Sequence, residues 1–333
     1  MTRLLLAGTG LIGHRHLRHI VEHPDLQLAG IIDPMPENRK MADAPGFADI
    51  DDVDVPADGI VIATPTRTHA PLTIKAAQRG WHVLVEKPVA EDADAVQQMI
   101  NAADQAGVKI LVGHHRRHHP RVRKLKEVLD SGRIGAPVLG SLIWAMRKPD
   151  SYFDLDWRSG IDGGPVRQNL IHDVDMLRHM FGEVCHVSGF GTNFIRGAVR
   201  TESGGAVLGF DSGVTVTIAF ADTTPTPWGF EAGTGENPTI AQTGQDCLRI
   251  ASTEGGVEFP SLRIWDGARS WHERPESSET DVEDAVPLVR QLEHFADVIA
   301  GRTTPIVDAA DALKTLEATL QIEQATWPAG VAQ

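Results

Sequence analysis

Short apolar runs alternate with longer amphipathic stretches over the first third of the chain. The runs are too brief for helices and favour buried parallel strands, whose two faces are both covered. The stretches between them place apolar residues at helical spacing. This alternation predicts an α/β fold with a doubly wound parallel sheet. The predicted strands are residues 4–7, 26–32, 59–63, 81–85 and 109–113, with a minor strand near Phe47, and the helices are 11–22, one ending at Gln78, and 92–106.

The pattern changes after a predicted helix at residues 121–129. Short strands separated by turns follow, interrupted by one helical stretch near 165–181 and by an irregular loop at 223–243. This succession of short strands and turns predicts an α+β domain with a largely antiparallel open sheet. The outer face of that sheet is expected to be free to serve as an oligomer interface. Amphipathic helices at 288–300 and 309–325 close the chain. The predicted strands are 137–146, 184–194, 205–210, 214–220, 247–252 and 262–265.

The turn after the first apolar run has the spacing Gly8-x-Gly10-x-x-Gly13. A strand before it and a helix after it form the context that a dinucleotide-binding fingerprint requires. Gly8 allows the tight turn, Gly10 lets the backbone approach a pyrophosphate, and Gly13 lets the helix pack close to the strand. Amides at the helix start then face the phosphates. The residues expected to contact the cofactor here are Gly8, Thr9, Gly10, Leu11, Ile12 and Gly13.

Asp33 ends the second predicted strand, twenty residues after Gly13. A carboxylate at this place accepts hydrogen bonds from the ribose hydroxyls of a bound dinucleotide. It would also repel a 2′-phosphate, so the sequence favours NAD. Arg39 and Lys40 follow closely and keep NADP possible. We therefore expect a Rossmann domain at residues 1–120 and a substrate-binding and oligomerisation domain at 121–333, with the helices of 286–325 packing back toward the Rossmann domain.

Two further segments follow predicted strands of this sheet. Thr64, Pro65 and His69 come after the third strand, and Glu86 and Lys87 come after the fourth. Ligands bind doubly wound sheets at the carboxyl ends of the strands, so we expect all five residues near the cofactor.

Lys87 is the first candidate catalytic residue. Pro88 restricts it to an extended backbone, which would project its ammonium group over the crevice. A cation there can hydrogen-bond a reacting hydroxyl and stabilise the alkoxide that forms as hydride leaves. The alternative is an ordinary surface lysine after a strand, and these residues alone favour that alternative.

The second candidate is the helix that begins after Asp162-Gly163-Gly164. Pro165 suits the first helical position, and Asn169 and His172 lie three residues apart on one face. A neutral histidine beside a substrate hydroxyl is a natural general base. The alternative, a helix histidine bonded to a backbone carbonyl, is at least as well supported by the spacing. The predicted buried stripe is Val166, Leu170, Val174 and Leu177.

Taken in this order, these motifs resemble the Gfo/Idh/MocA family of NAD(P)-dependent oxidoreductases. The resemblance spans almost the whole chain and also includes residues 112–120 and 132–135 and the Trp157-Arg158 pair. It implies hydride transfer from a secondary alcohol, often of a sugar or cyclitol, with Lys87 orienting the oxygen and His172 removing its proton. The family usually has Asp at the position of Asn169, so we assign Asn169 to substrate orientation. A homodimer or homotetramer through the second sheet is also implied.

The run His114–His119 contains four histidines and two arginines. Two interposed guanidiniums oppose a metal ion, so we expect no metal site. Arg116, together with Arg158, is a candidate for binding an anionic substrate group, because Arg presents a fork that matches a carboxylate. A positive loop that contacts cofactor phosphates or solvent is an equal alternative. Trp157 and Trp228 suit the apolar face of a polyol, although packing is the commoner fate of such residues.

Composition narrows the possible partners. A formal net charge of −14 argues against nucleic acid and anionic membranes. No apolar run is long enough to span a membrane. The two cysteines, Cys185 and Cys247, match neither a metal site nor a disulfide framework, so we expect two reduced core thiols in a cytoplasmic protein.

The sequence thus predicts an NAD(P)-dependent dehydrogenase that oxidises a secondary alcohol of a sugar, cyclitol or related polyhydroxylated ring. One alternative is a dehydrogenase for a carboxylated ring, such as an aromatic dihydrodiol. Another is a non-catalytic, NAD-responsive sensor on the same fold. The presence of both Lys87 and His172 argues against a sensor, which needs neither acid–base group.

Overall fold

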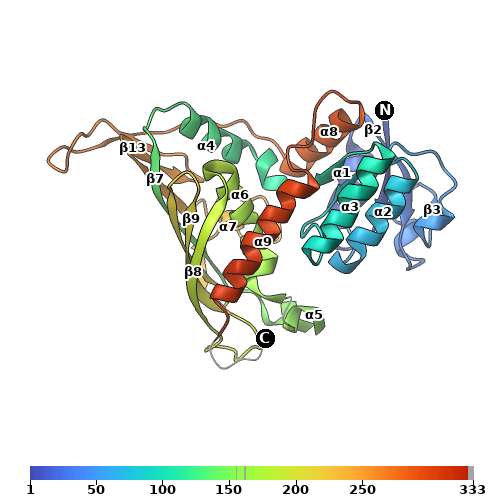
Figure 1. Cartoon of the computed structure of the whole chain (residues 1–333), viewed down its shortest axis with the longest axis horizontal. Helices are drawn as coiled ribbons and strands as arrows, with labels where there is room; N and C mark the ends of the chain where they lie inside the picture. Colours follow the sequence, from blue (N-terminus) through green and yellow to red (C-terminus); the bar gives the residue numbers. More distant parts are fainter. Residues whose placement is uncertain (155, 161–162, 329–333) are drawn as a thin grey trace. The chain divides into compact units, whose positions relative to one another are not determined.

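The computed structural model describes residues 1–154, 156–160 and 163–328, without the side chains of Asp156 and Trp157. The chain forms two compact units (Figure 1). The first unit contains residues 1–118 and 285–316, and the second contains 119–284 and the chain from Glu317 onward. Among the described helices, none is long and apolar enough to cross a membrane.

The first unit is built on a parallel sheet of six strands in the order β3-β2-β1-β4-β5-β6. This order confirms the predicted doubly wound sheet. The order reverses between β1 and β4, and ligands bind such sheets at the carboxyl ends of the strands beside that point. The strands are β1 (Thr2–Ala7), β2 (Leu26–Ile32), β3 (Gly46–Phe47), β4 (Gly59–Ile62), β5 (His82–Val85) and β6 (Ile110–Val112).

Helices α1 (Leu11–Glu22), α2 (His69–Gln78) and α3 (Ala93–Ala106) connect these strands. Their ends follow local signals in the sequence. The Asp92 side chain caps α3 by accepting a hydrogen bond from the Ala95 amide, and Gly107 ends the helix with a φ of 68°.

The closing helix α8 (Pro287–Ile299) belongs to the first unit. Its Leu292 and Phe295 are fully buried in a core that includes Leu4 and Leu84. Helix α9 (Ala309–Ala325) contributes its first half to this unit and its second half to the other. The first segment of this unit ends at residue 118, close to the predicted division at 120, and the unit also contains α8 from the segment 286–325 that was expected to pack back toward it.

The second unit contains a sheet of nine strands in the order β15-β14-β13-β12-β7-β10-β9-β8, with β11 paired to β7. All pairings are antiparallel except that of β7 with β10, which confirms the predicted sheet type. The strands are β7 (Pro137–Met146), β8 (Val184–Thr192), β9 (Ser203–Phe210), β10 (Thr215–Ala221), β11 (Pro225–Trp228), β12 (Leu248–Ser252), β13 (Gly255–Phe259), β14 (Ile264–Asp266) and β15 (Glu276–Ser278).

Helices cover one face of this sheet (Figure 1). Side chains of α4 (Pro120–Asp130), α6 (Ile171–Phe181) and the end of α9 share a core with the strands. The segment predicted as an irregular loop at 223–243 contains β11 and the short helix α7 (Phe230–Thr234). Cys247 is buried, but Cys185 is exposed on β8, so the expectation of two core thiols is wrong for Cys185.

Candidate active site

The glycine-rich turn joins β1 to α1, and its three glycines have different surroundings. A Cβ added to Gly13 would lie 2.2 Å from the Gly8 carbonyl oxygen, and one added to Gly8 would lie 2.8 Å from the Ala63 carbonyl oxygen. Gly8 also has a φ of +83°, which L side chains rarely adopt. No heavy atom lies within 4 Å of a Cβ built on Gly10. The turn is therefore closed at Gly8 and Gly13 and open at Gly10, as a pyrophosphate-binding loop requires.

Asp33 is fixed directly after β2 and is 6% exposed. Its Oδ2 accepts hydrogen bonds from the amide (3.1 Å) and the hydroxyl (2.9 Å) of Thr9. Its Oδ1 accepts from the Met35 amide and the Asn38 side chain, both at 3.0 Å. Burial alone would raise the pKa of Asp33, but these hydrogen bonds outweigh it and lower the pKa. These contacts of Thr9 and Asn38 with Asp33 are not predicted by the glycine-turn pattern.

A surface pocket of about 360 Å³ lies beyond Asp33 and is lined in part by Arg39 and Lys40. The Arg39 guanidinium reaches the Asp33 carbonyl oxygen at 3.5 Å. These two cations are the residues that keep NADP possible, whereas the Asp33 carboxylate favours NAD.

The loops after β4 and β5 are tied together by His69. One ring nitrogen of this buried histidine lies 2.8 Å from the Thr64 carbonyl oxygen and the other lies 2.9 Å from that of Pro88. Burial lowers the pKa of His69. His69 therefore holds the two loops together. The cofactor contact of Thr64 and Pro65 stays a prediction.

Glu86 is buried and faces α1, where its Oε1 lies 2.8 Å from His16 Nε2. Gly113 makes room for it, since a Cβ there would lie 2.9 Å from Glu86 Oε2. Burial alone would raise the pKa of Glu86, but the hydrogen bond to His16 and the charges of His16, His115 and Lys87 lower it to about 2. His16 thus holds the Glu86 side chain in the interior of the first unit, and the cofactor contact of Glu86 stays a prediction.

Lys87 is half-buried and is anchored on both sides. Its amide donates to Glu86 Oε2 at 3.3 Å, and the carbonyl of Pro88, which follows a cis peptide bond, lies against His69. Strands β1, β4 and β5 are neighbours in the sheet. The glycine turn and the Thr64 and Lys87 loops therefore follow the carboxyl ends of three adjacent strands.

In the second unit, the predicted helix begins as a π-helical turn, Val166–Leu170, and continues as α6. The predicted buried stripe is confirmed, with Val166, Leu170, Val174 and Leu177 all at most 2% exposed. The wider π turn changes which side chains share a face, so α-helical spacing does not by itself bring Asn169 and His172 together. Such turns occur frequently at functional sites.

Asn169 lies on the π turn and His172 on the first turn of α6. The Asn169 Oδ1 atom is buried and, among the residues that the structure describes, has no hydrogen-bond partner. His172 is 9% exposed. A buried amide oxygen without a partner is costly, so Asn169 is suited to accept a hydrogen bond from a ligand hydroxyl.

The short helix α5 (Asp156–Ser159) precedes this turn. Its Arg158 guanidinium lies 4.4 Å from the centroid of the Tyr152 ring. A Cβ on Gly163 would lie 1.9 Å from the Arg158 carbonyl oxygen, so only glycine fits there. Asp162 and the Trp157 side chain lie outside the described residues, and the substrate contact of Trp157 stays a prediction.

The His114–His119 run is buried, which makes the expectation of a solvent-facing positive loop wrong. Arg117 pairs with Asp311 at 2.7 Å, and His119 caps α4 by accepting from a backbone amide. Arg116 is 1% exposed, and its substrate contact stays a prediction. No group of His, Cys, Asp and Glu residues within the described ranges is arranged to hold a metal ion.

Trp228 ends β11, where it pairs with Ala145 of β7. Its side chain is 40% exposed, so burial in the core does not account for it. Its predicted substrate contact also remains a prediction.

Comparison with known proteins agrees with this fold. Residues 2–114 match the oxidoreductase family with an NAD-binding Rossmann fold, and residues 122–258 match the GFO/IDH/MocA C-terminal domain. A putative NADPH-dependent oxidoreductase from Desulfitobacterium hafniense has the same fold, with a TM-score of 0.83, 20% identity, and coverage of 98% of this chain and 95% of that one.

Two curated relatives are inositol dehydrogenases. Inositol 2-dehydrogenase of Rhizobium meliloti is 33% identical over 187 residues, which cover 54% of this chain and 55% of that protein. The scyllo-inositol 2-dehydrogenase (NAD(+)) of Bacillus subtilis is 26% identical over 338 residues, covering 95% of this chain and 91% of that protein. In the first two relatives found, this chain spans only 55% and 62% of the relative's length.

The fold and the glycine turn define the class of protein, an oxidoreductase-family chain with an NAD-binding Rossmann unit. The chain belongs to the Gfo/Idh/MocA family, since models of both family domains match successive parts of it. The resemblance predicted from the sequence is thereby confirmed.

Proposed function

We propose that this protein is an NAD-dependent dehydrogenase that oxidises a secondary alcohol on a polyhydroxylated ring, such as a sugar or cyclitol. The relatives named inositol dehydrogenases support this substrate class. The structural observation that carries it is the buried, unpartnered Oδ1 of Asn169 on the π turn beside His172. A hydroxyl-rich substrate supplies the donor which that oxygen needs.

In this proposal Gly8, Gly10, Gly13 and Asp33 hold the dinucleotide, which when bound accepts a hydride from the carbinol carbon. The Lys87 ammonium donates a hydrogen bond to the reacting oxygen and stabilises negative charge on it. His172 takes the hydroxyl proton as general base. Asn169 accepts a hydrogen bond from a neighbouring hydroxyl and fixes the ring orientation.

The proposal is tested with purified protein, NAD and a panel of inositols, sugars and dihydrodiols. We expect the absorbance of reduced nicotinamide to rise with at least one polyol. Binding of NAD in a calorimetric titration, combined with no turnover on the whole panel, would favour the sensor alternative.

His172→Ala tests the assigned base. We expect turnover to fall by about 10²–10⁴-fold, the usual contribution of a general base, with NAD affinity unchanged. His272→Ala is a matched control, because His272 is an exposed histidine in the second unit. Turnover near the wild-type value in His172→Ala would remove His172 from the mechanism.

A further inference from the structure

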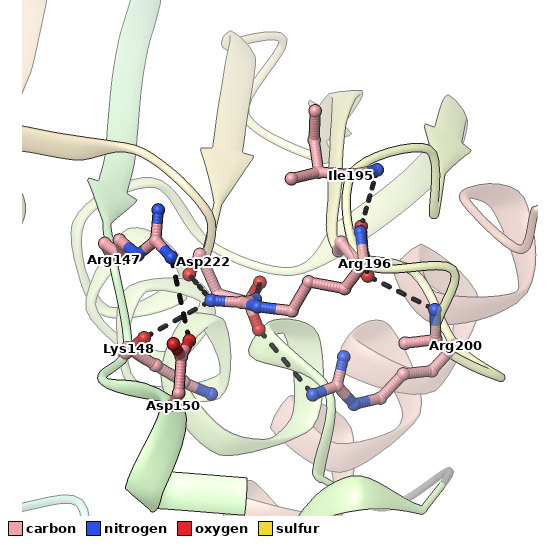
Figure 2. Close-up of polar contacts among 9 residues, drawn as sticks. Arg147, Lys148, Asp150, Ile195, Arg196, Arg200 and Asp222 are labelled. Atoms are coloured by element: carbon pink, nitrogen blue, oxygen red, sulfur yellow. Dashed lines mark hydrogen bonds and ion pairs between the residues drawn. The ribbon is translucent and has the colours of Figure 1, made fainter.

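Cationic side chains gather around Asp222 at one edge of the second sheet (Figure 2), and two aromatic rings lie near them. Lys148 follows β7 and Asp222 follows β10, and these strands are parallel neighbours, so both residues lie at the same edge. The Lys148 amide donates to the Asp222 carbonyl oxygen at 3.0 Å. We call Lys148, Arg158, Arg196 and Arg200 the cationic cluster.

The loop between β8 and β9 that carries two of these arginines is held in place by Glu202. This carboxylate is fully buried and accepts hydrogen bonds from the amides of Ile195 (3.1 Å), Arg196 (2.9 Å) and Ala198 (3.2 Å). The Thr201 hydroxyl also donates to the Thr326 carbonyl oxygen at 2.7 Å. The positions of Arg196 and Arg200 are therefore fixed by the fold itself.

Arg196 has a structural role in this arrangement. Its guanidinium donates to Asp222 Oδ1 at 2.5 Å, to the Asp222 carbonyl oxygen at 2.9 Å and to the Lys148 carbonyl oxygen at 3.3 Å. Its hydrogen bonds clamp the loop to the ends of β7 and β10 (Figure 2).

Arg200 differs from Arg196, although both face the same carboxylate. It is 2% exposed, and its Nη2 lies 3.7 Å from Asp222 Oδ2, which is beyond hydrogen-bond distance. Its Nε and Nη1 atoms, like Asp222 Oδ2, are buried and have no hydrogen-bond partner within the described part of the chain. Burial lowers the pKa of Arg200, and Asp222 only partly opposes this shift.

Two aromatic rings line the surroundings of Arg200. The Phe153 ring centroid lies 4.8 Å from the Arg196 guanidinium and 5.1 Å from that of Arg200. The Tyr152 ring centroid lies 4.7 Å from the Lys148 ammonium and 4.4 Å from the Arg158 guanidinium. Ring faces attract cations but do not neutralise them, and they leave the Arg200 Nε and Nη1 donors without an oxygen acceptor.

The structure assigns to Arg200 a binding site for an oxyanion, and we propose that this oxyanion is a carboxylate carried by the substrate. One incompletely paired guanidinium matches a single negative charge, whereas the nearby Asp222 disfavours a dianionic phosphate. The substrate class then becomes a ring polyol that bears an acid group, such as a uronic acid. This inference rests on the proposed function and makes its substrate class more specific.

The residues that connect the cationic cluster with the π turn of Asn169 also belong to the second unit. Arg158 shares the Tyr152 ring with Lys148, and its carbonyl packs directly against Gly163. The π turn with Asn169 begins three residues after Gly163. Arg158, one member of the cluster, and the π turn are therefore close together in the sequence.

The test compares neutral and acidic sugars of the same ring: glucose with glucuronate, galactose with galacturonate, and mannose with mannuronate. We expect the wild type to have a lower KM for at least one acid than for its neutral partner. Arg200→Met should raise the KM for that acid by at least about tenfold, which is about 1.4 kcal/mol of lost binding, without changing kcat for the neutral sugar. Arg200→Lys keeps the charge, so its KM for that acid should lie between those of the wild type and Arg200→Met.

Arg147→Met is the matched control, because Arg147 lies next to the cluster but is half exposed and pairs with Asp150 at 3.6 Å. We expect it to keep the wild-type preference for the acid. Equal KM values for an acid in the wild type and Arg200→Met would overturn the proposal. So would a fall in thermal stability in Arg200→Met with no change in acid binding, which would show that Arg200 is structural.

Binding measured without turnover separates this inference from the proposed function. Uronates should raise the melting temperature of the wild type saturably and should not raise that of Arg200→Met, even if no sugar is oxidised. Absence of saturable binding for every acid overturns the inference, although the dehydrogenase proposal survives if a neutral polyol is oxidised. Saturable stabilisation by inorganic phosphate through Arg200, with no preference for any acid, would identify a free anion as the ligand and overturn the assignment to the substrate.

Discussion

Among single residues, Glu86 shows most directly how burial and charge oppose each other. Removing a carboxylate from water favours its neutral form, yet the His16 ring and the neighbouring positive charges keep Glu86 ionised. The result is a buried, hydrogen-bonded pair of His16 and Glu86, and Glu86 directly precedes Lys87 in the chain. This pair stabilises the fold only while Glu86 carries its charge.

Glu86→Gln tests this pair, because it removes the charge and keeps an amide oxygen facing His16. The pKa of Glu86 is lowered from 4.5 to about 2 in the folded protein, so its stabilisation is present above about pH 4.5 and is lost as the pH falls toward 2. A shift of this size corresponds to about 3 kcal/mol. We expect Glu86→Gln to be less stable than the wild type by about that amount at neutral pH, and the difference to shrink on acidification. Urea unfolding at several pH values measures it.

Glu22→Gln provides the control for this experiment. Glu22 is an exposed residue of α1 that pairs with Arg18 at the surface, where ion pairs contribute little. We expect its free energy of unfolding to match that of the wild type at every pH. A difference between the wild type and Glu86→Gln that does not change with pH would contradict the assigned cause.

The sequence was sufficient to predict residues whose role depends on local geometry. Gly8 and Gly13 fall in this group, because a strand–turn–helix pattern determines what each position requires. The pairing of His16 with Glu86 could not be predicted, since 70 residues separate them and only the sheet brings them together. The same holds for Arg200, whose place beside Asp222 depends on how one loop folds around Glu202.

At the scale of secondary structure, the turn between β1 and α1 combines two requirements that can be separated by substitution. Gly13 has to be glycine because the Gly8 carbonyl oxygen lies against it, whereas Gly10 has no protein atom nearby that would exclude a side chain. Gly10 has a φ of −67°, which alanine adopts without strain.

Gly13→Ala and Gly10→Ala should therefore have opposite effects. We expect Gly13→Ala to lower stability by about 1–3 kcal/mol, as overpacking against rigid backbone does. Gly10→Ala should keep the melting temperature of the wild type and weaken NAD binding by at least about tenfold, because its methyl group occupies the space for the pyrophosphate. Thermal unfolding and calorimetric titration with NAD measure the two effects. Wild-type NAD affinity in Gly10→Ala would show that the open side of the turn does not receive the cofactor.

Elements with a strong apolar period were predicted at nearly their observed bounds, and α1 and β7 are examples. The strands that the sequence did not predict, such as β11 and β13, are short or have an atypical composition. β13 begins with Gly255-Gly256, which favours a turn, and β11 contains two prolines that only an edge position tolerates. The π turn at 166–170 was missed because its apolar stripe is the one that an α-helix would also have.

At the scale of the whole molecule, the chain returns to its first unit after completing most of the second. The sequence predicted that α8 packs back toward the Rossmann domain, but not which residues it meets there, because periodicity shows that a face is buried and not what buries it. Leu292 and Phe295 complete the core around Leu4, so the first unit is built from two segments that lie far apart in the sequence.

In the described part of the chain, helices cover only one face of the second sheet (Figure 1), and the other face carries an apolar row. Ile143, Ala219, Gly205 and Phe190 lie side by side across β7, β10, β9 and β8. Phe190 is 73% exposed, and Leu139 on the same face of β7 is 50% exposed. Contiguous exposed apolar surface of this kind is typical of an interaction site.

We propose that this face joins two or four copies of the chain, because the row is apolar and contains no charged residue, as the centre of a homodimer interface is depleted of charge. Ala219→Lys places a charge in the middle of the row and should convert the assembly to monomers, since a lysine buried there would have no partner. Val21→Lys, an equally apolar-to-charged change at an exposed position of α1, should leave the assembly intact. Sedimentation velocity distinguishes the species. A monomeric wild type, or an Ala219→Lys variant that stays assembled, would contradict an interface through this face.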